Sequence, residues 1–407
     1  MDDSMLKIRN VLLEVIQQMA AKEVFPTLEP GASEFMHQHP FAFCVATCLD
    51  RGARAEIIWT IPYWIFKQVG HFDPLKFNQL SLPQITGIFL ALPRKPRYIN
   101  AALELRAAGI GRRDRVALVM PNGPETAAAL LSVMSAAACA PLNPQYSEAE
   151  FDFYLSDLKA GAVIVARNGG SPVLAPSRRL NLKIIELSPE AGSAAGAFRL
   201  GCESAPEPGA GGPAAPGETA LLLHTSGTTA RPKLVALSQS NLAASARGIA
   251  SGLDLKPADR CLNVMPLFHV HGMVAALLAT LASGGSVVCA PGFLASEFFG
   301  WLADFAPTWY TGVPTMHHAV LARAAESRKP VRGGPLRFIR SCSASLPPSL
   351  MAGLEEAFGV PVLEAYGMTE ASHQMASNPL PPRKRKPGSA GLPAGADIAV
   401  MDDGGRL

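Results

Sequence analysis

The apolar positions in the first part of this chain recur with the spacing of helices. Residues 4–22 place leucine, valine and isoleucine three or four positions apart. We expect two further helices over residues 41–49 and 55–69. Proline and basic residues then crowd the junction at residues 92–97. The pattern predicts a mostly helical N-terminal segment over residues 1–97.

From residue 98 onward, short apolar runs alternate with helical stretches. Residues 115–120 and 162–166 are predicted strands, and the Ala-rich residues 125–139 between them are a predicted helix. A chain that alternates strand and helix in this way forms sheets covered by helices. We therefore predict an α/β fold for residues 98–407, with layered βα sheets flanked by helices.

Composition narrows the class of protein without deciding its function. The chain has 407 residues, of which 48% are hydrophobic and 17% charged, so it can bury a large core. Its net charge of +3 gives no reason to expect a nucleic-acid partner. The seven cysteines are scattered, which is typical of reduced thiols in the cytoplasm. No apolar run reaches the ~18 residues of a membrane span, and the acidic start lacks the features of a secretory signal, so we expect a cytoplasmic protein.

One segment has the composition of a phosphate-binding loop. The run His224-Thr-Ser-Gly-Thr-Thr-Ala-Arg-Pro-Lys233 follows residues 220–223, which are a predicted buried strand. Gly227 permits a tight turn in which backbone N–H groups converge on an anion, and the hydroxyls add further donors. Lys233 supplies a compact positive charge. A Ser/Thr-rich surface turn is the alternative, but the strand before the loop and the lysine after it favour a nucleotide site.

Two histidines lie in an otherwise apolar run, Pro266-Leu-Phe-His-Val-His-Gly272. His269 and His271 would be costly to bury without hydrogen-bond partners. Satisfied core histidines and a chance pair are alternatives to a ligand-binding role. A metal pair is less favoured because no cysteine or carboxylate lies close by in the sequence.

Two later segments end strand-like runs in small or polar residues. The first, Arg340-Ser-Cys-Ser-Ala-Ser345, would by itself be a Ser-rich turn. The second, Glu364-Ala-Tyr-Gly-Met-Thr-Glu370, follows the strand-like residues 360–363. Its Thr-Glu pair alone is typical of a helix N-terminus.

Together these segments resemble the adenylate-forming superfamily, which includes acyl-CoA synthetases, luciferases and peptide-synthetase adenylation domains. The loop at residues 224–233 resembles that family's phosphate loop, and residues 364–370 resemble its Tyr-Gly-x-Thr-Glu motif. The two motifs occur in the family's order, about 140 residues apart. Ala230 and Leu234 depart from the family pattern, which commonly has glycine at both positions.

The resemblance implies ATP or AMP as ligand, Mg²⁺ as metal, and CoA in a second half-reaction. In the family, a carboxylate attacks the α-phosphorus of ATP, and CoA then displaces AMP. Tyr366 would stack on adenine, Thr369 would bind the α-phosphate, and Glu370 would be the metal ligand. The resemblance implies catalytic roles for Lys233, Thr369, Glu370 and His269. It implies nucleotide binding by Thr225, Ser226, Gly227, Thr228, Thr229, Lys233, Ser343, Ala344, Glu364, Ala365, Tyr366, Gly367, Met368 and Thr369.

Within the family, the chain resembles the oxalate–CoA ligase branch in the loop at residues 224–229 and in residues 266–272, 336–346 and 369–375. Oxalate carries a second carboxylate, which needs polar hosts rather than an apolar tunnel. The resemblance therefore implies a small carboxylate as substrate. It places His269 beside the acyl pocket, and the candidate hosts of the second carboxylate are His271, Ser341 and His373.

The two ends of the chain add expectations of a different kind. Residues 397–407 resemble the opening of a further β-subdomain, after which the family has a ribose-binding Asp and a C-terminal lid domain. We expect a large domain truncated before both, with incomplete turnover. A non-catalytic nucleotide- or acyl-binding remnant and a gene-model fusion are the alternatives. Residues 40–73 resemble the opening helices of helix-hairpin-helix DNA glycosylases but lack the hairpin and catalytic residues, which favours a plain helical segment.

Overall fold

The computed structural model describes residue 32 and residues 62–67, 104–106, 108–193, 195–202, 214–225, 232–326, 333–399 and 401–406. The chain divides into two compact units, Met1–Leu103 and Glu104–Leu407. In the first unit, residues 62–67 are helical, and they are the described part of the helix expected over 55–69. The helices expected over 4–22 and 41–49 lie outside the described residues. In the described part of the chain, no helix combines the length and the apolar character needed to cross a membrane.

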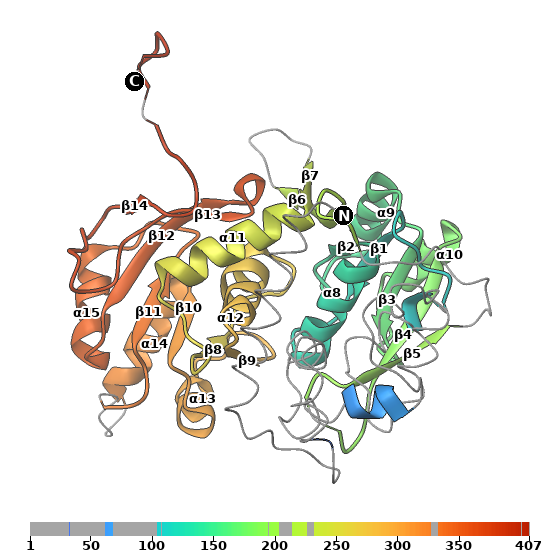
Figure 1. The fold of residues 1–407 in the computed structure, drawn as a ribbon, viewed down its shortest axis with the longest axis horizontal. Helices are drawn as coiled ribbons and strands as arrows, with labels where there is room; N and C mark the ends of the chain where they lie inside the picture. The colour runs from blue at the N-terminus through green and yellow to red at the C-terminus, as the bar shows by residue number, and fades with distance from the viewer. Residues whose placement is uncertain are drawn as a thin grey trace, which may run out of the picture. The chain divides into compact units, whose positions relative to one another are not determined.

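The second unit begins with a seven-stranded sheet, sheet A, in the order β5-β4-β3-β1-β2-β6-β7 (Figure 1). Its inner strands are parallel, and the edge strands β5 and β7 run antiparallel to their neighbours. The strands are β1 (Arg115–Val119), β2 (Ala138–Pro141), β3 (Ala162–Ala166), β4 (Lys183–Pro189), β5 (Phe198–Cys202), β6 (Thr219–Thr225) and β7 (Lys233–Ser238). The helices of this part are α8 (Pro124–Ala136), α9 (Glu148–Leu158) and α10 (Leu174–Arg179).

The helix expected over 125–139 was wrong at its C-terminal end. Helix α8 ends at Ala136, and Ala138–Pro141 form β2 instead. Alanine favours helices, but here these residues are fully buried between β1 and β6. Tertiary pairing therefore overrides the local propensity.

A second seven-stranded sheet, sheet B, has the order β14-β13-β12-β11-β10-β8-β9. Strands β8 to β12 are parallel, whereas β13 and β14 turn back antiparallel. The strands are β8 (Arg260–Asn263), β9 (Ser286–Cys289), β10 (Trp309–Gly312), β11 (Phe338–Ser341), β12 (Val362–Met368), β13 (His373–Ser377) and β14 (Leu392–Pro393). The helices are α11 (Gln239–Gly252), the π-helix η1 (His271–Leu278), α12 (Ala279–Ala282), α13 (Phe298–Phe305), α14 (Pro314–Glu326), α15 (Pro348–Phe358) and the 3₁₀ turn η2 (Thr369–Ala371).

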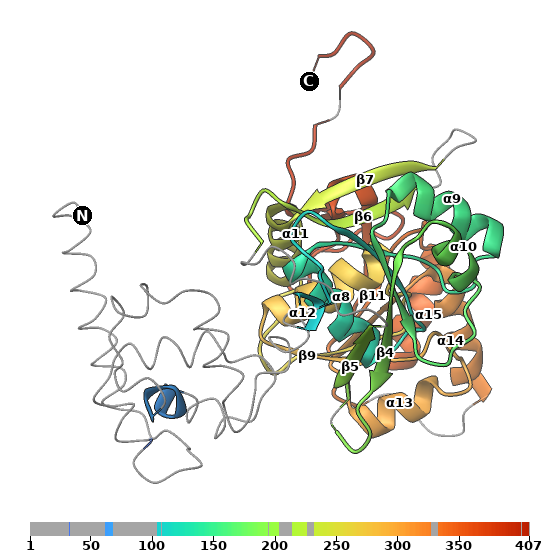
Figure 2. The same ribbon diagram turned by 90° about the vertical axis from the view of Figure 1, so that its right-hand side faces the viewer.

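The two sheets share one core, and each has a second core on its outer face. Trp309 and Phe338 belong to the core between the sheets, whereas Tyr310 and Ile339, one residue further on, face the outer core. Side chains alternate between the faces of a strand, and burying each large apolar one contributes about 1.5–3 kcal/mol. Figure 1 shows α13, α14 and α15 beside sheet B, α8, α11 and α12 between the sheets, and α9 and α10 beside sheet A. The second unit is therefore a layered α/β fold, and Figure 2 shows its helices from a second direction.

The strand register creates a polar row on the inner face of sheet B. Asn263, Thr311 and Arg340 lie side by side on β8, β10 and β11, near the carboxyl ends of these strands. All three are buried, with 0–1% of their surface exposed. Ligand sites of parallel α/β sheets form at the carboxyl ends of the strands, so this edge of sheet B is where a site is expected.

Candidate functional site

The segment that resembles a phosphate loop joins β6 to β7. The predicted strand at residues 220–223 is confirmed, and it extends to Thr225, which pairs with Lys233 across the antiparallel ladder. Ser226, Gly227, Thr228 and Thr229 lie outside the described residues. Lys233 opens β7 with its side chain exposed. The structure thus places the lysine at the loop end of a β-hairpin, directly after the phosphate-loop segment.

The hairpin lies against the second motif, although the two are far apart in the sequence. Strand β7 contacts the 3₁₀ turn η2, which contains Thr369 and Glu370. Helix α11 follows β7 directly, and its Ser245 hydroxyl donates a hydrogen bond of 2.7 Å to the carbonyl of Ser372. The fold therefore brings Lys233 and the Thr369–Glu370 pair to the same region.

The Tyr-Gly part of the second motif lies within a strand. We expected the strand to end at residue 363, but β12 continues to Met368. Strand β13 pairs with this extension so closely that a Cβ on Gly367 would lie 1.7 Å from the carbonyl oxygen of His373. Only glycine fits there, and its small size lets β13 approach. The Tyr366 ring beside it is 51% exposed, which leaves a face available to a ligand.

The second motif also contains the residue expected to bind Mg²⁺. The carboxylate of Glu370 is exposed and forms no hydrogen bond or ion pair with another described residue. The described residues contain no group of three or more His, Cys, Asp or Glu that could hold a metal by themselves. A single free carboxylate fits Mg²⁺, which proteins usually hold through one or two carboxylates together with substrate phosphates.

Behind this motif, five buried polar residues form a connected cluster. We call His271, Thr311, Arg340, His373 and Gln374 the polar cluster; none is more than 4% exposed. Arg340 Nη2 donates to His373 Nε2 and to Gln374 Oε1, each at 3.1 Å. Arg340 Nη1 lies 3.4 Å from both His271 Nε2 and Thr311 Oγ1. The two imidazole rings stack with centroids 5.3 Å apart.

The hydrogen bonds determine the protonation of both histidines. Arginine can only donate, so His271 Nε2 and His373 Nε2 must accept, and each ring carries its proton on Nδ1. Burial, together with the neighbouring His373 ring and the Arg340 guanidinium, holds the pKa of His271 well below its usual value. Burial and the Arg340 guanidinium do the same to the pKa of His373. Both rings are therefore neutral at pH 7, and Arg340 carries the charge of the cluster.

The polar cluster is linked to the surface at the expected adenine loop. His271 Nδ1 donates to Ser343 Oγ at 3.0 Å. Ser343 and Ala344 are exposed, and Ser343 has a left-handed φ of 72°. Residues in this region of φ are uncommon and gather at functional sites. His271 also opens the π-helix η1, a rare element that is frequent at functional sites.

The structure separates some of the predicted residues from the cluster. His269 is exposed, and its ring lies beside Phe268, 4.7 Å between centroids. Ser341 is fully buried, but it follows Arg340 on β11 and therefore faces the other side of the strand. Its hydroxyl has no hydrogen-bond partner. Glu364 is also buried; Oε1 accepts from the backbone N–H of Leu346 at 2.9 Å, whereas Oε2 has no partner.

Sequence reasoning missed two sets of residues. Thr311, Arg340 and Gln374 belong to the polar cluster; the signal was an arginine inside the apolar strand run Phe338-Ile-Arg-Ser341. The second set is a hydrogen-bonded pair at the end of β6, next to the phosphate-loop segment. His224 Nε2 lies 3.0 Å from Asp157 Oδ2 on α9, while His224 Nδ1 is buried without a partner.

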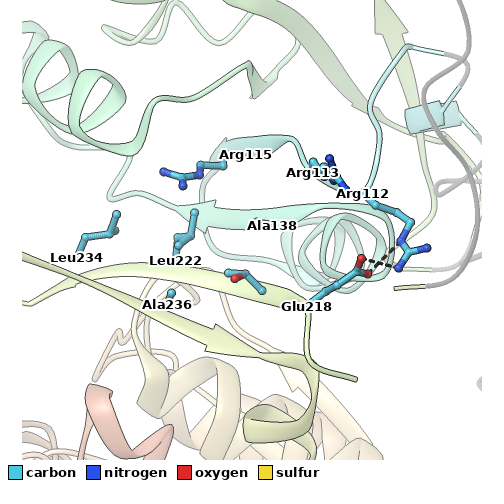
Figure 3. A pocket seen from close by; sticks show the side chains of 9 residues that line it. Arg112, Arg113, Arg115, Ala138, Glu218, Leu222, Leu234 and Ala236 are labelled. Atoms are coloured by element: carbon cyan, nitrogen blue, oxygen red, sulfur yellow. Dashed lines mark hydrogen bonds and ion pairs between the residues drawn. The ribbon is translucent and has the colours of Figure 1, made fainter. Parts of the chain in front are cut away.

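A pocket of about 410 Å³ lies elsewhere on the second unit (Figure 3). Figure 3 shows arginines at its rim, with Arg112 bonded to Glu218, and apolar side chains of β6 and β7. It contains none of the predicted site residues, and Arg115, Ala138 and Thr219 begin their strands there. The pocket therefore lies at the amino ends of β1, β2 and β6, apart from the candidate site.

Comparison with known proteins shows which family and which relatives the chain is similar to. A family model described as AMP-binding enzyme matches residues 97–407. The oxalate–CoA ligase of Arabidopsis thaliana is 43% identical over 305 residues, which cover 74% of this chain and 59% of that protein. The oxalate–CoA ligase of Saccharomyces cerevisiae is 41% identical over 361 residues, which cover 82% and 61%. The crystal structure of ATP-bound MatB from Rhodopseudomonas palustris is similar with a TM-score of 0.62 and 26% identity, covering 77% of this chain and 59% of that one. The chain thus spans 59–61% of the length of these relatives.

Proposed function

Because this chain belongs to the AMP-binding enzyme family, we propose that residues 98–407 activate a small, oxalate-like carboxylate with ATP. The products of this step are an acyl-adenylate and pyrophosphate, and the acyl group then passes to CoA. The observation that carries the proposal is the hydrogen bond between His271 Nδ1 and Ser343 Oγ. It joins the residues expected to bind the carboxylate to the loop expected to bind adenine.

On the nucleotide side, the proposal assigns each motif a part of ATP. The loop residues Thr225, Ser226, Gly227, Thr228 and Thr229, with Lys233, bind the phosphates. Ser343, Ala344 and residues 364–368 surround adenine, and the exposed ring of Tyr366 stacks on it. Thr369 donates a hydrogen bond to the α-phosphate. Glu370 would hold Mg²⁺, which neutralises phosphate charge when it is bound.

The chemistry requires two anions to meet, so charge neutralisation and alignment are the main tasks of the protein. Lys233 brings a positive charge to the phosphates from the hairpin that contacts η2. Burial of the reacting carboxylate beside Thr369 strengthens each electrostatic contact. Every one of these contacts serves to bring the carboxylate oxygen in line with the α-phosphorus.

On the carboxylate side, the polar cluster argues against a fatty acid. A long acyl chain needs an apolar tunnel, whereas this position holds two histidines and an arginine. The related proteins of A. thaliana and S. cerevisiae are oxalate–CoA ligases. We therefore take oxalate as the first substrate to test.

The described cysteines are free thiols, and on that ground we propose a cytoplasmic location.

ATP–pyrophosphate exchange with oxalate tests the proposal, with Mg²⁺ in excess because oxalate binds it. We expect exchange in the wild-type protein and its loss in Lys233→Ala. Lys384→Ala, which removes another exposed lysine, is the matched control and should exchange like wild type. Intact ATP binding by calorimetry without exchange would contradict the proposal and identify a nucleotide-binding remnant.

A further inference from the structure

Building on the proposed function, we propose that Arg340 determines specificity by binding the second, non-reacting carboxylate of a short dicarboxylate. The residue touches substrate rather than acting through a neighbour. Arg340 would thus make the protein prefer a dicarboxylate over a monocarboxylate of the same size.

Arg340 is a buried cation that has no counter-ion among the described residues. Its side chain is fully buried, and no Asp or Glu of the described residues forms an ion pair with it. Glu364, on the adjacent strand, instead accepts a hydrogen bond from the backbone of Leu346. Buried charges in proteins are normally paired, because the loss of hydration is otherwise uncompensated. An unpaired buried arginine is therefore a receptor for an anion that the chain does not supply.

Every hydrogen-bond partner of Arg340 in the described chain is neutral. His271 and His373 accept hydrogen bonds as neutral rings, and Thr311 and Gln374 carry no charge. The thiols of Cys261 and Cys342 lie nearby, and burial raises the pKa of Cys261 well above its usual value. These groups orient the guanidinium but leave its charge uncompensated.

Two hydrogen-bond donors in the polar cluster are free, and a carboxylate is the kind of group that accepts from them. Arg340 Nε and Gln374 Nε2 are buried and have no hydrogen-bond partner. Both atoms donate, whereas an ionised carboxylate accepts at both oxygens. A second carboxylate at Arg340 would therefore supply the missing negative charge and an acceptor for an orphaned donor. Charge-assisted hydrogen bonds of arginine to carboxylates are among the strong ones in proteins.

The backbone holds the cluster in a fixed arrangement. Ser372 and His373 have positive φ angles of 56° and 102°, which are strained for residues other than glycine. This backbone directs the His373 ring onto Arg340. His271 bridges from Arg340 to the exposed Ser343, so the cluster lies directly behind the nucleotide loop.

Oxalate and oxamate provide a matched pair of probes. Oxamate has the size and shape of oxalate but carries a neutral amide in place of the second carboxylate. In the wild-type protein we expect kcat/KM for ATP–pyrophosphate exchange to favour oxalate over oxamate by about 100-fold or more. In Arg340→Gln the kcat/KM for oxalate should fall by a similar factor, whereas the kcat/KM for oxamate should change much less. Arg340→Lys keeps the charge and should retain part of the preference.

The comparison of oxalate with oxamate in the wild-type protein needs no folded variant, and a thermal shift needs no turnover. We expect oxalate, but not oxamate, to raise the thermal unfolding midpoint of the wild-type protein. The shift should be absent in Arg340→Gln and reduced in Arg340→Lys. Absence of exchange with any carboxylate overturns the proposed function, while the thermal shift still reports on Arg340. Equal thermal shifts of the wild-type protein with oxalate and with oxamate would overturn the role of Arg340. Equal losses of kcat/KM for the two probes in folded Arg340→Gln would also overturn it.

Discussion

His373 accepts a hydrogen bond from the guanidinium of Arg340 at 3.1 Å, and both side chains are buried. The two residues are 33 positions apart and reach each other only because β13 turns back along β12. As an acceptor, His373 must be neutral, so it orients the charge of Arg340 without cancelling it. The interior of sheet B therefore holds a positive charge that its hydrogen-bond partners orient but do not neutralise.

Buried histidines make the stability of this protein depend on pH near neutrality. Burial lowers the pKa of His317 to about 4 and holds those of His271 and His373 well below the usual range. The unfolded chain, with histidine pKa values of about 6.5, therefore takes up protons that the folded chain does not. The stabilising effect is complete above pH ~6.5 and is lost as the pH falls, at up to about 1.4 kcal/mol per pH unit for each histidine.

Urea unfolding between about pH 7.5 and pH 5 measures this dependence. We expect His317→Gln to reduce the slope of the unfolding free energy against pH by the amount that one proton contributes. His317 lies outside the polar cluster and bonds to Tyr310, so the variant reports on this histidine alone. An unchanged slope in this variant would contradict the assignment.

Asp259 makes the stability of the protein depend on pH in a more acidic range than the histidines do. Its carboxylate is 2% exposed and accepts hydrogen bonds from Thr308 Oγ1 at 2.6 Å, from Lys256 N at 2.8 Å and from Arg337. Burial alone would raise its pKa, but these three bonds together outweigh burial and hold the pKa below its usual value. The contribution of Asp259 to the free energy of unfolding is therefore complete above pH ~4, near the pKa of unfolded Asp. This contribution is lost as the pH falls further.

We expect Asp259→Asn to lower the free energy of unfolding at pH 7 by about 2–3 kcal/mol. The difference from wild type should shrink below pH ~4. Asp254→Asn is the control, because that exposed carboxylate pairs only at the surface and should cost less than about 1 kcal/mol. Equal losses in the two variants would be inconsistent with this account.

Gly367 is required by the close approach of β13. Gly367→Ala places a Cβ 1.7 Å from the carbonyl oxygen of His373, so the two strands must separate. We expect a loss of about 1–3 kcal/mol or more in urea unfolding, and weaker exchange activity because Tyr366 and His373 both shift. Gly217→Ala, where a Cβ meets open space, should change stability by less than about 0.5 kcal/mol. Wild-type stability of Gly367→Ala would show that β12 and β13 are not paired as described.

The pair formed by His224 and Asp157 orients the residue that precedes the phosphate loop. The His224 side chain is 6% exposed and packs edge-on against Tyr154, 4.8 Å between centroids. Asp157→Ala removes its hydrogen-bond partner, and we expect the KM for ATP in the exchange assay to rise several-fold, because His224 is then less firmly held next to Thr225 at the end of β6. Asp152→Ala, on the same helix but paired with Arg179 at the surface, should leave that KM unchanged. Equal KM values in both variants would contradict the role.

Local chemistry made much of this protein predictable from its sequence. The alternation of apolar runs and helices predicted the layered α/β fold, because side-chain periodicity directly reflects burial. The residues of the two nucleotide motifs were recognisable because a phosphate or a base requires small side chains and hydroxyls at successive positions. Where propensity misled, as at residues 138–141, pairing between strands outweighed the helical preference of alanine.

The tertiary structure alone decided what surrounds the substrate. In the sequence, Arg340 is one polar residue in an apolar strand, 69 positions from His271 and 33 from His373. Strand register and the turn of β13 bring these side chains together in the interior, where Arg340 forms no ion pair with an acidic residue of the described chain. The absence of a counter-charge is a property of three-dimensional surroundings, which no local pattern encodes. The sequence by itself therefore determined the layered fold and the two motifs that resemble a nucleotide site, whereas tertiary packing decided where a buried charge lies without an ion-pair partner among the described residues.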